Sequence, residues 1–203
     1  MSDYALPAGL KLIHFQMRIM PLTKQYASVY SGQTQVTDML SENWVAQLDI
    51  APGGPNDRAL GLTIEAFFDR LKGAANRVVL SNLRVKANQG TMRGSPVLTS
   101  AVAQLSNILP ITTTVGATAL PGDMLSCGGQ LFRVMSPATA DGSGHMSVEV
   151  APRVRASAGL ASGAAVTWNQ PTALFRLSSA NPSVDWIPDG YTVTSIELRE
   201  DVS

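Results

Sequence analysis

Apolar and polar residues alternate along most of the first fifty positions, which is the period of a strand with one buried face. The clearest stretch is 42–50, where one face carries only apolar side chains: Trp44, Ala46, Leu48 and Ile50. The same period predicts strands over 10–20, 25–30 and 33–40, the last two paired around Ser31-Gly32. The N-terminal part of the chain is therefore predicted to form a β-sheet.

The period changes after the Pro- and Gly-rich stretch 51–56, which ends the last of these strands. Apolar residues then recur at helix spacing and predict one helix: Leu60, Ile64, Phe67, Phe68 and Leu71. Gly54 or Asn56 is expected to cap its start, and Gly73 to follow its last turn. The two adjacent Phe rings are expected to anchor this helix onto the sheet.

Charged residues become rare from Thr91 to Pro171. This stretch holds seven: Arg93, Asp123, Arg133, Asp141, Glu149, Arg153 and Arg155. Short strands are predicted at 107–113, 122–127, 130–135, 146–150 and 165–168, with hairpin turns at Gly128-Gly129 and 141–144. Closely spaced turn signals are typical of a small barrel or sandwich, so 91–171 is predicted to be an inserted β-module.

Strand patterns flank this insert. Strands are predicted at 77–80 before it and at 174–177 after it, followed by turns at Asn181-Pro182 and 188–190. One long strand over 191–198 then either closes the first sheet or forms an edge that pairs with a neighbouring subunit. The predicted fold is mainly β, with a sheet domain formed by 1–90 and 172–203 that carries one helix.

Composition limits the classes of function. Lys+Arg and Asp+Glu both number 15, so the formal net charge is zero and gives no general attraction to nucleic acid or to anionic membranes. No window approaches the roughly 20 apolar residues of a membrane span, and residues 1–12 do not resemble a secretory signal. We therefore expect a soluble protein made in the cytoplasm, without a membrane anchor or specific nucleic-acid binding.

Residues with catalytic or metal-binding chemistry are few. His14, in a predicted strand, is expected to be partly buried, and His145, after a Gly-rich turn, is expected to be solvated; neither has a partner at metal-ligand spacing. Cys127, the only cysteine, precedes a hairpin turn and is expected to be buried and inert. No catalytic, metal or cofactor site is predicted.

Two weaker possibilities involve charged residues of the insert. Asp123, Asp141 and Glu149 are the carboxylates that a hydrolase would need, although both aspartates lie in turns, where Asp is common for structural reasons. Arg153 and Arg155 suit a phosphate or a carboxylate partner, although a solvated strand face is the simpler interpretation.

Three aromatic residues have no obvious place in a core. Trp168, Trp186 and Tyr191 are the candidate contacts for a subunit interface or a glycan. Trp186 lies between Pro182 and Pro188 in a turn-rich stretch and is therefore expected to be exposed.

The order of these features resembles a known family. A Trp strand (Glu42-Asn-Trp-Val-Ala-Gln-Leu) leads to the helix Ile64-Glu-Ala-Phe-Phe-Asp-Arg-Leu-Lys-Gly and the strand Asn76-Arg-Val-Val-Leu. Met92-Arg-Gly-Ser-Pro-Val, Leu120-Pro-Gly-Asp-Met-Leu-Ser-Cys-Gly-Gly, Ala140-Asp-Gly-Ser-Gly, Val148-Glu-Val-Ala-Pro-Arg-Val-Arg and Ala173-Leu-Phe-Arg-Leu follow in turn. From about Trp44 to Leu177 the chain resembles the distal tail proteins of long-tailed bacteriophages. The stretch Ala151-Pro-Arg departs from the pattern, since similar proteins tend to carry an aromatic residue before the Pro.

The resemblance implies a non-enzymatic structural protein of the virion tail tip. Its belt domain, a β-sandwich or split barrel with one packed helix, would form a ring of six copies at the end of the tail tube. The ring's partners would be the tail tube protein, the hub or baseplate proteins and, in addition, receptor-binding fibres. The alternative is a carbohydrate-binding adsorption module, in which the 91–171 insert and its aromatic residues contact a glycan.

Overall fold

The computed structural model describes residues 1–27, 29, 31–83, 87–178, 182–193 and 195–202. The fold is mainly β, with one α-helix and a nearly closed barrel-like sheet, which confirms the predicted fold class. The chain forms two compact units. Unit 1 comprises 1–18, 45–87 and 170–203, and unit 2 comprises 19–44 and 88–169.

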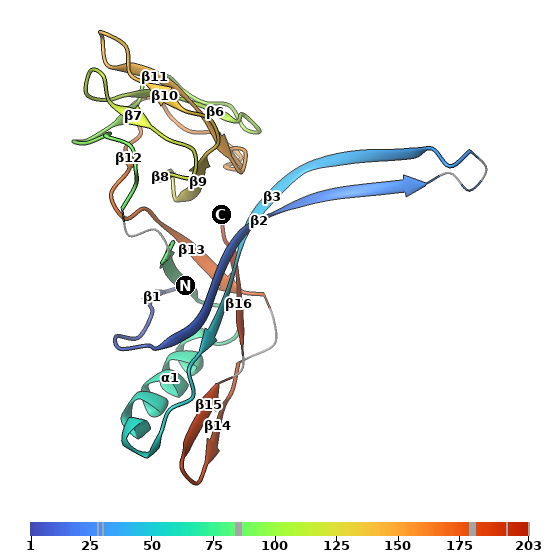
Figure 1. Ribbon diagram of the computed structural model, residues 1–203, viewed down its shortest axis with the longest axis vertical. Coiled ribbons are helices and arrows are strands. Elements are labelled where there is room, and N and C mark those ends of the chain that lie inside the picture. Colours follow the sequence, from blue (N-terminus) through green and yellow to red (C-terminus); the bar gives the residue numbers. More distant parts are fainter. Residues whose placement is uncertain (28, 30, 84–86, 179–181, 194, 203) are drawn as a thin grey trace. The chain divides into compact units, whose positions relative to one another are not determined.

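Unit 1 is built on a six-stranded sheet in the order β1-β4-β13-β16-β3-β2 (Figure 1). Its strands are β1 (Asp3–Ala5), β2 (Leu12–Ala27), β3 (Thr34–Ile50), β4 (Arg77–Ser81), β13 (Thr172–Leu177) and β16 (Ile196–Glu200). β1 runs parallel to β4, and β13 and β16 pair antiparallel with their neighbours. β1 and β2 are therefore the two edges of this sheet.

The alternation of apolar and polar residues in the sequence agrees with the core of unit 1. Ala46, Leu48 and Ile50 of β3 are buried as predicted, and Val45 is buried as well. Met17 is buried and Phe15 is partly buried on β2. His14 has the opposite parity on the same edge strand and is exposed, so the prediction that it would be partly buried was wrong.

The C-terminal strand differs from its prediction. Instead of one strand over 191–198, the structure has β15 (Gly190–Val193) in a separate hairpin and β16 in the main sheet. β16 lies between β13 and β3, so it completes the sheet and is not an edge. Four predicted residues lie outside the described residues: Ser28 and Tyr30 of the 25–30 strand, Asn181 of its turn, and Thr194.

The predicted helix is confirmed as α1 (Arg58–Leu71), preceded by the short 3-10 helix η1 (Pro55–Asp57). Gly54 caps η1, whereas Asp57 occupies the N-cap position of α1. At the other end Lys72 and Gly73 both adopt positive φ, as a left-handed helix end requires. The buried face of α1 consists of Gly61, Ile64, Phe67, Phe68 and Leu71.

A small hairpin packs on α1. Its strands are β14 (Val184–Ile187) and β15, and Trp186 pairs with Tyr191 across it. Tyr191 is 1% exposed, and its ring centroid lies 5.8 Å from that of Trp186. A Cβ on Gly61 would come within 2.8 Å of both rings, so only glycine lets the helix and hairpin approach this closely.

The second sheet of six strands belongs to unit 2 and has the order β12-β8-β9-β11-β6-β5 (Figure 1). Its strands are β5 (Val97–Leu98), β6 (Ile108–Thr112), β8 (Met124–Cys127), β9 (Gln130–Val134), β11 (His145–Ala151) and β12 (Val166–Thr167). β7 (Thr118–Ala119) and β10 (Ala138–Thr139) form a short additional pair. The two outer strands approach each other through Leu98 N to Ala164 O and Val166 N to Pro96 O, both 2.9 Å, which nearly closes the barrel.

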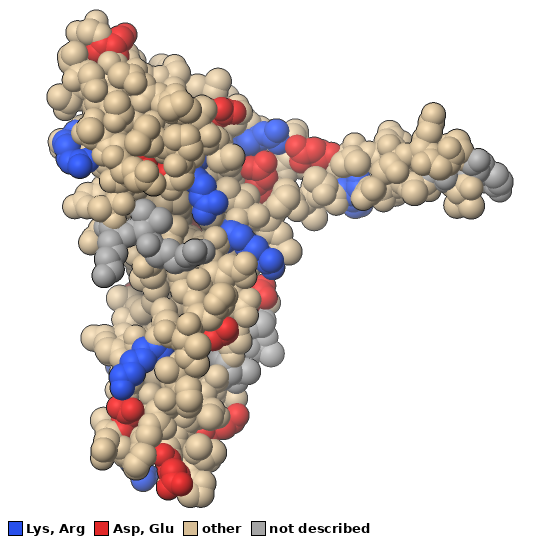
Figure 2. Space-filling model, in the orientation of Figure 1, with Lys and Arg blue, Asp and Glu red and all other residues tan. Residues whose placement is uncertain are grey.

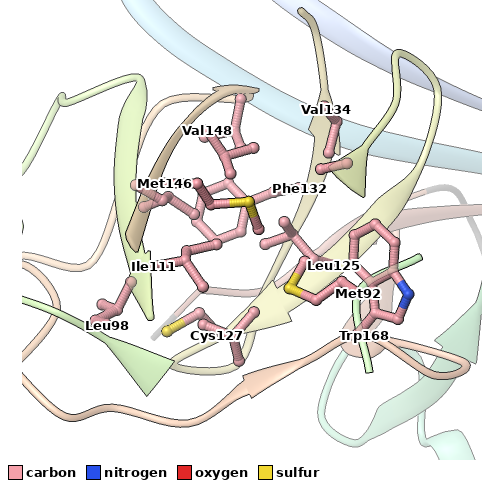
Figure 3. Packing of buried hydrophobic residues seen from close by; sticks show 14 of the residues in the cluster. Met92, Leu98, Ile111, Leu125, Cys127, Phe132, Val134, Met146, Val148 and Trp168 are labelled. Atoms are coloured by element: carbon pink, nitrogen blue, oxygen red, sulfur yellow. The ribbon is translucent and has the colours of Figure 1, made fainter. Parts of the chain in front are cut away.

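The predicted turns of unit 2 are present. Gly128 and Gly129, with φ of 59° and 80°, connect β8 to β9 as a two-residue hairpin. The barrel encloses one apolar core in which Ile111, Leu125, Phe132, Met146 and Val148 converge (Figure 3).

Replacing Gly61 should release the β14–β15 hairpin from α1. In Gly61→Ala, the added Cβ meets both aromatic rings and costs about 1–3 kcal/mol of overpacking. The helix propensity gained, about 1 kcal/mol, offsets only part of this cost. We expect faster hydrogen exchange of the amides of 184–193. Gly54→Ala, whose Cβ meets no atom within 4 Å, is the matched control and should leave exchange unchanged; equal exchange in both variants would contradict this packing.

Candidate interaction surface

The three aromatic candidates have different environments. Trp168 belongs to the unit 2 core and is 6% exposed, and Tyr191 of β15 is buried where the hairpin packs on Gly61 of α1. Neither ring presents a face to a ligand. Trp186 is 41% exposed, as expected, and it lies in strand β14 instead of in a turn. The Arg58 guanidinium lies 5.8 Å from its ring centroid.

The carboxylate of Asp123, which is buried in the insert, binds backbone amides of its own unit. Asp123 is 1% exposed and accepts hydrogen bonds from the backbone amides of Gln89, Gly90 and Leu120 at 2.6, 3.0 and 2.8 Å. The side chain of Asn88 likewise bonds both backbone groups of Met124. These contacts hold the segment 88–90 against the start of β8.

The other two candidate carboxylates do not join Asp123. Asp141 accepts hydrogen bonds from the amides of His145 and Ser143, which lower the pKa of its carboxyl and organise the 141–144 turn. Glu149 is exposed on β11. Among the described residues, no group of three His, Cys, Asp or Glu side chains is arranged to hold a metal ion.

Cys127 is buried in the barrel core, as predicted, and burial raises the pKa of its thiol. A protonated thiol is a poor nucleophile at neutral pH. His145 is exposed, in agreement with the sequence interpretation. No helix in the described part of the chain combines the length and apolar character that a membrane span needs.

Residues 38–44 of β3 are fastened to the unit 2 barrel. The indole Nε1 of Trp44 donates to Leu131 O at 2.8 Å, and the Arg133 guanidinium lies 4.9 Å from its ring centroid. The segment 152–155 supplies the remaining contacts. Its Arg153 binds the carboxylate of Asp38 at 3.1 Å.

The segment 152–155 is itself held from the barrel side. The side chain of Gln130, 0% exposed, donates to Arg153 O at 2.7 Å and accepts from Arg155 N at 2.9 Å. On the β3 side, Glu42 accepts a hydrogen bond from Arg153 N at 3.1 Å. The Arg155 guanidinium donates to the side-chain oxygen of Asn43. The two arginines are therefore not a solvated strand face, because they join the barrel to β3.

The amide of Leu40 and the Arg153 guanidinium both donate to Asp38 and lower the pKa of its carboxyl. Asp38 is therefore charged at neutral pH, and its ion pair with Arg153 is complete there. These contacts fix the base of a ribbon that we call the arm, consisting of the described residues of 19–37.

The arm is a two-stranded ribbon formed by the outer parts of β2 and β3 (Figure 1). Met20, Leu22 and Tyr26 alternate with polar or small residues on β2, so they share one face with Lys24. Their exposed fractions are 51%, 51% and 57%. An apolar stripe on one face is the pattern of a strand that buries that face, yet no element among the described residues covers it.

The arm is also nearly uncharged. Between 19 and 40 the sequence has two charged residues, Lys24 and Asp38, and Figure 2 shows the arm as mostly uncharged surface. Natural proteins protect exposed strands with charges, bulges or covering elements. An isolated two-stranded hairpin is at best marginally stable in water. The arm is therefore the best candidate in the described chain for a surface that binds another protein.

The sequence identified the strands of the arm but not their exposure. Period-2 patterns predict one buried face, and they do not say whether the cover comes from the same chain. The signal that could have located the arm is the low charge of 19–40 combined with two predicted strands around a tight turn. The boundaries 91 and 171 lie within three residues of the unit 2 limits 88 and 169, whereas 19–44 groups with unit 2 and not with the first domain.

No protein-family model matches the chain, and no curated protein matches it at a significant level. The functional inference therefore depends on the sequence resemblance and on the geometry of the surfaces described above.

Asp123 provides a test of a structural against a catalytic carboxylate. Asp123→Asn removes charge-assisted hydrogen bonds to buried amides and should lower the free energy of unfolding by about 1–3 kcal/mol. Urea unfolding followed by circular dichroism measures this loss. Asp141→Asn, in an exposed turn, is the control and should cause a smaller change. An unchanged unfolding midpoint in Asp123→Asn would show that the carboxylate does not hold the 88–90 segment.

Proposed function

We propose that this chain is a non-enzymatic structural subunit that assembles with copies of itself, as the ring at the distal end of a bacteriophage tail tube. The observation that carries the proposal is the arm, whose apolar stripe is exposed and lies on a ribbon that is marginal alone. A neighbouring copy in a ring covers this stripe. The ordered resemblance to distal tail proteins supplies the setting.

The inventory of the chain fits a structural role. The buried polar side chains whose bonds are described above, Asp123 and Gln130, bind backbone groups of their own unit. In the described part of the chain, the ring that packs against the half-exposed Trp186 is that of Tyr191, which is itself buried. A glycan platform of stacked aromatic faces is therefore less well supported than a protein interface.

In the proposed setting, a ring of six copies joins the tail tube protein to the hub or baseplate proteins, and receptor-binding fibres attach beyond it. Closed cyclic symmetry lets one modest contact, repeated around the ring, hold every copy in place. The units have separate tasks in this proposal: unit 1 supplies the ring-forming sheet, and unit 2 supplies the arm and the barrel insert.

Immunogold electron microscopy tests the location. Antibody against this chain, applied to tailed particles from the genome that encodes it, should label the distal end of the tail tube. Label along the tube, at the head, or absent from purified particles would contradict the proposal.

A charge placed on the apolar stripe should weaken assembly. Burial of a leucine side chain contributes about 1.5–3 kcal/mol, and 1.4 kcal/mol corresponds to a factor of ten in association. Leu22→Lys is therefore expected to weaken self-association at least tenfold, measured by light scattering over a micromolar concentration series. Thr23→Lys adds the same charge at a neighbouring exposed position of opposite parity and should assemble like wild type. Equal effects of the two substitutions would contradict a one-faced contact.

A further inference from the structure

Two surfaces on opposite flanks of α1 have complementary chemistry. The first is the outward side of the β14–β15 hairpin. Asp185 and Ile187 are two residues apart on β14 and share the face opposite to Trp186. Ile187 is 48% exposed, and Asp189 lies in the adjoining turn. We call this the hairpin face: an exposed aliphatic side chain flanked by two acidic residues.

The second surface is a groove between α1 and the segment that contains the edge strand β1. Apolar side chains line much of it, together with Thr63; the lining residues besides Thr63 and Arg70 are Tyr4, Ala5, Pro7, Leu62, Ala66 and Phe67. Leu62 is 52% exposed. Arg70 lines the groove and also the adjoining hollow, where Lys72 and Asp69 contribute as well. We call this the helix groove: a partly apolar trough that ends at Arg70 and Lys72, with Asp69 beside them.

The helix itself separates the two surfaces. Gly61 faces the hairpin, and Arg70, nine residues later, lines the groove. At 3.6 residues per turn, nine residues amount to about two and a half turns, so positions 61 and 70 lie about 180° apart around the helix. Both surfaces belong to unit 1, and their relation is fixed by the unit's own packing.

We propose that the hairpin face of one copy docks into the helix groove of the next copy. The contact is heterologous, because two different patches of the same unit meet, and a contact of this kind closes into a ring when its rotation permits. Ile187 enters the helix groove beside Leu62. Asp185 and Asp189 meet Arg70 and Lys72, which carry the opposite charge.

A second copy is the occupant that these observations favour. Each copy has one hairpin face and one helix groove. Every subunit of a ring can therefore bind one neighbour through its hairpin face and the other through its helix groove. The sign of the charges also opposes the symmetric alternative, since two hairpin faces would place acidic residues against each other. This inference rests on the ring proposed above and names a contact of unit 1 that joins its subunits in addition to the arm.

Mixing two inactivated variants tests the pairing. Ile187→Asp blocks the hairpin face and leaves the groove intact, whereas Leu62→Asp blocks the groove and leaves the hairpin face intact. Each variant alone should associate at least tenfold more weakly than wild type. With one variant isotopically labelled, native mass spectrometry of the mixture should show unlike pairs well in excess of like pairs, because only an unlike pair retains one complete hairpin–groove contact. Recovery by mixing also shows that both variants are folded.

Charge reversal supplies an independent pair of variants on exposed side chains. Asp189→Lys and Arg70→Glu should each weaken association, and the double variant should recover it in part. Glu149→Arg, at an exposed position on β11 of unit 2, is the control and should not change it. Three results would overturn the docking. They are wild-type association of Ile187→Asp or Leu62→Asp, a statistical mixture of like and unlike pairs in the mixing experiment, and no recovery in the double variant Asp189→Lys/Arg70→Glu. If the variants remain ringed, the ring stands and this interface fails. If the wild-type chain is monomeric, the ring itself fails.

Discussion

A two-stranded ribbon with an uncovered apolar face is the constraint on which the rest of this structure depends. β-Ribbons of two strands are marginal in water because they bury too little apolar surface to offset the entropy of ordering the backbone. Met20, Leu22 and Tyr26 line one face of the arm, and no part of the described chain covers them. The base of the arm, in contrast, is fixed by Trp44, Asp38 and the segment 152–155. A fixed base and an uncovered outer part are what we expect of an arm whose apolar face is buried by another subunit.

The barrel insert is best understood through the same constraint. Gln130 holds the backbone of Arg153 and Arg155 from inside unit 2, and the two arginine side chains hold β3 on the other side. Arg153 and Arg155, which suited a phosphate or a carboxylate partner, are therefore bound to Asp38, Glu42 and Asn43 of β3, at the base of the arm. Asp123 is similarly occupied by the amides of the 88–90 segment. These charged side chains of the charge-poor barrel hold backbone segments and β3 in place.

Local patterns predicted the local structure well. The spacing of Ile64, Phe67 and Leu71 located the helix, and Gly128-Gly129 located a hairpin, because both signals act within a few residues. Long-range contacts decided what the sequence could not. Trp168, which follows β12, is buried in the barrel core, and its carbonyl accepts a hydrogen bond from Asn88. Trp44 donates to Leu131 O, 87 residues away. The β14–β15 hairpin packs on Gly61 of α1, a long-range contact that no short sequence pattern reveals.

The central claim is that copies of this chain complete one another. The most direct measurement is electron microscopy of the purified full-length chain at micromolar concentration, with class averages viewed down the symmetry axis. Closed rings of a single stoichiometry, six in the proposed setting, are the predicted result. Uniform monomers at concentrations where the chain is folded would contradict the account, because the arm would then be stable without a cover.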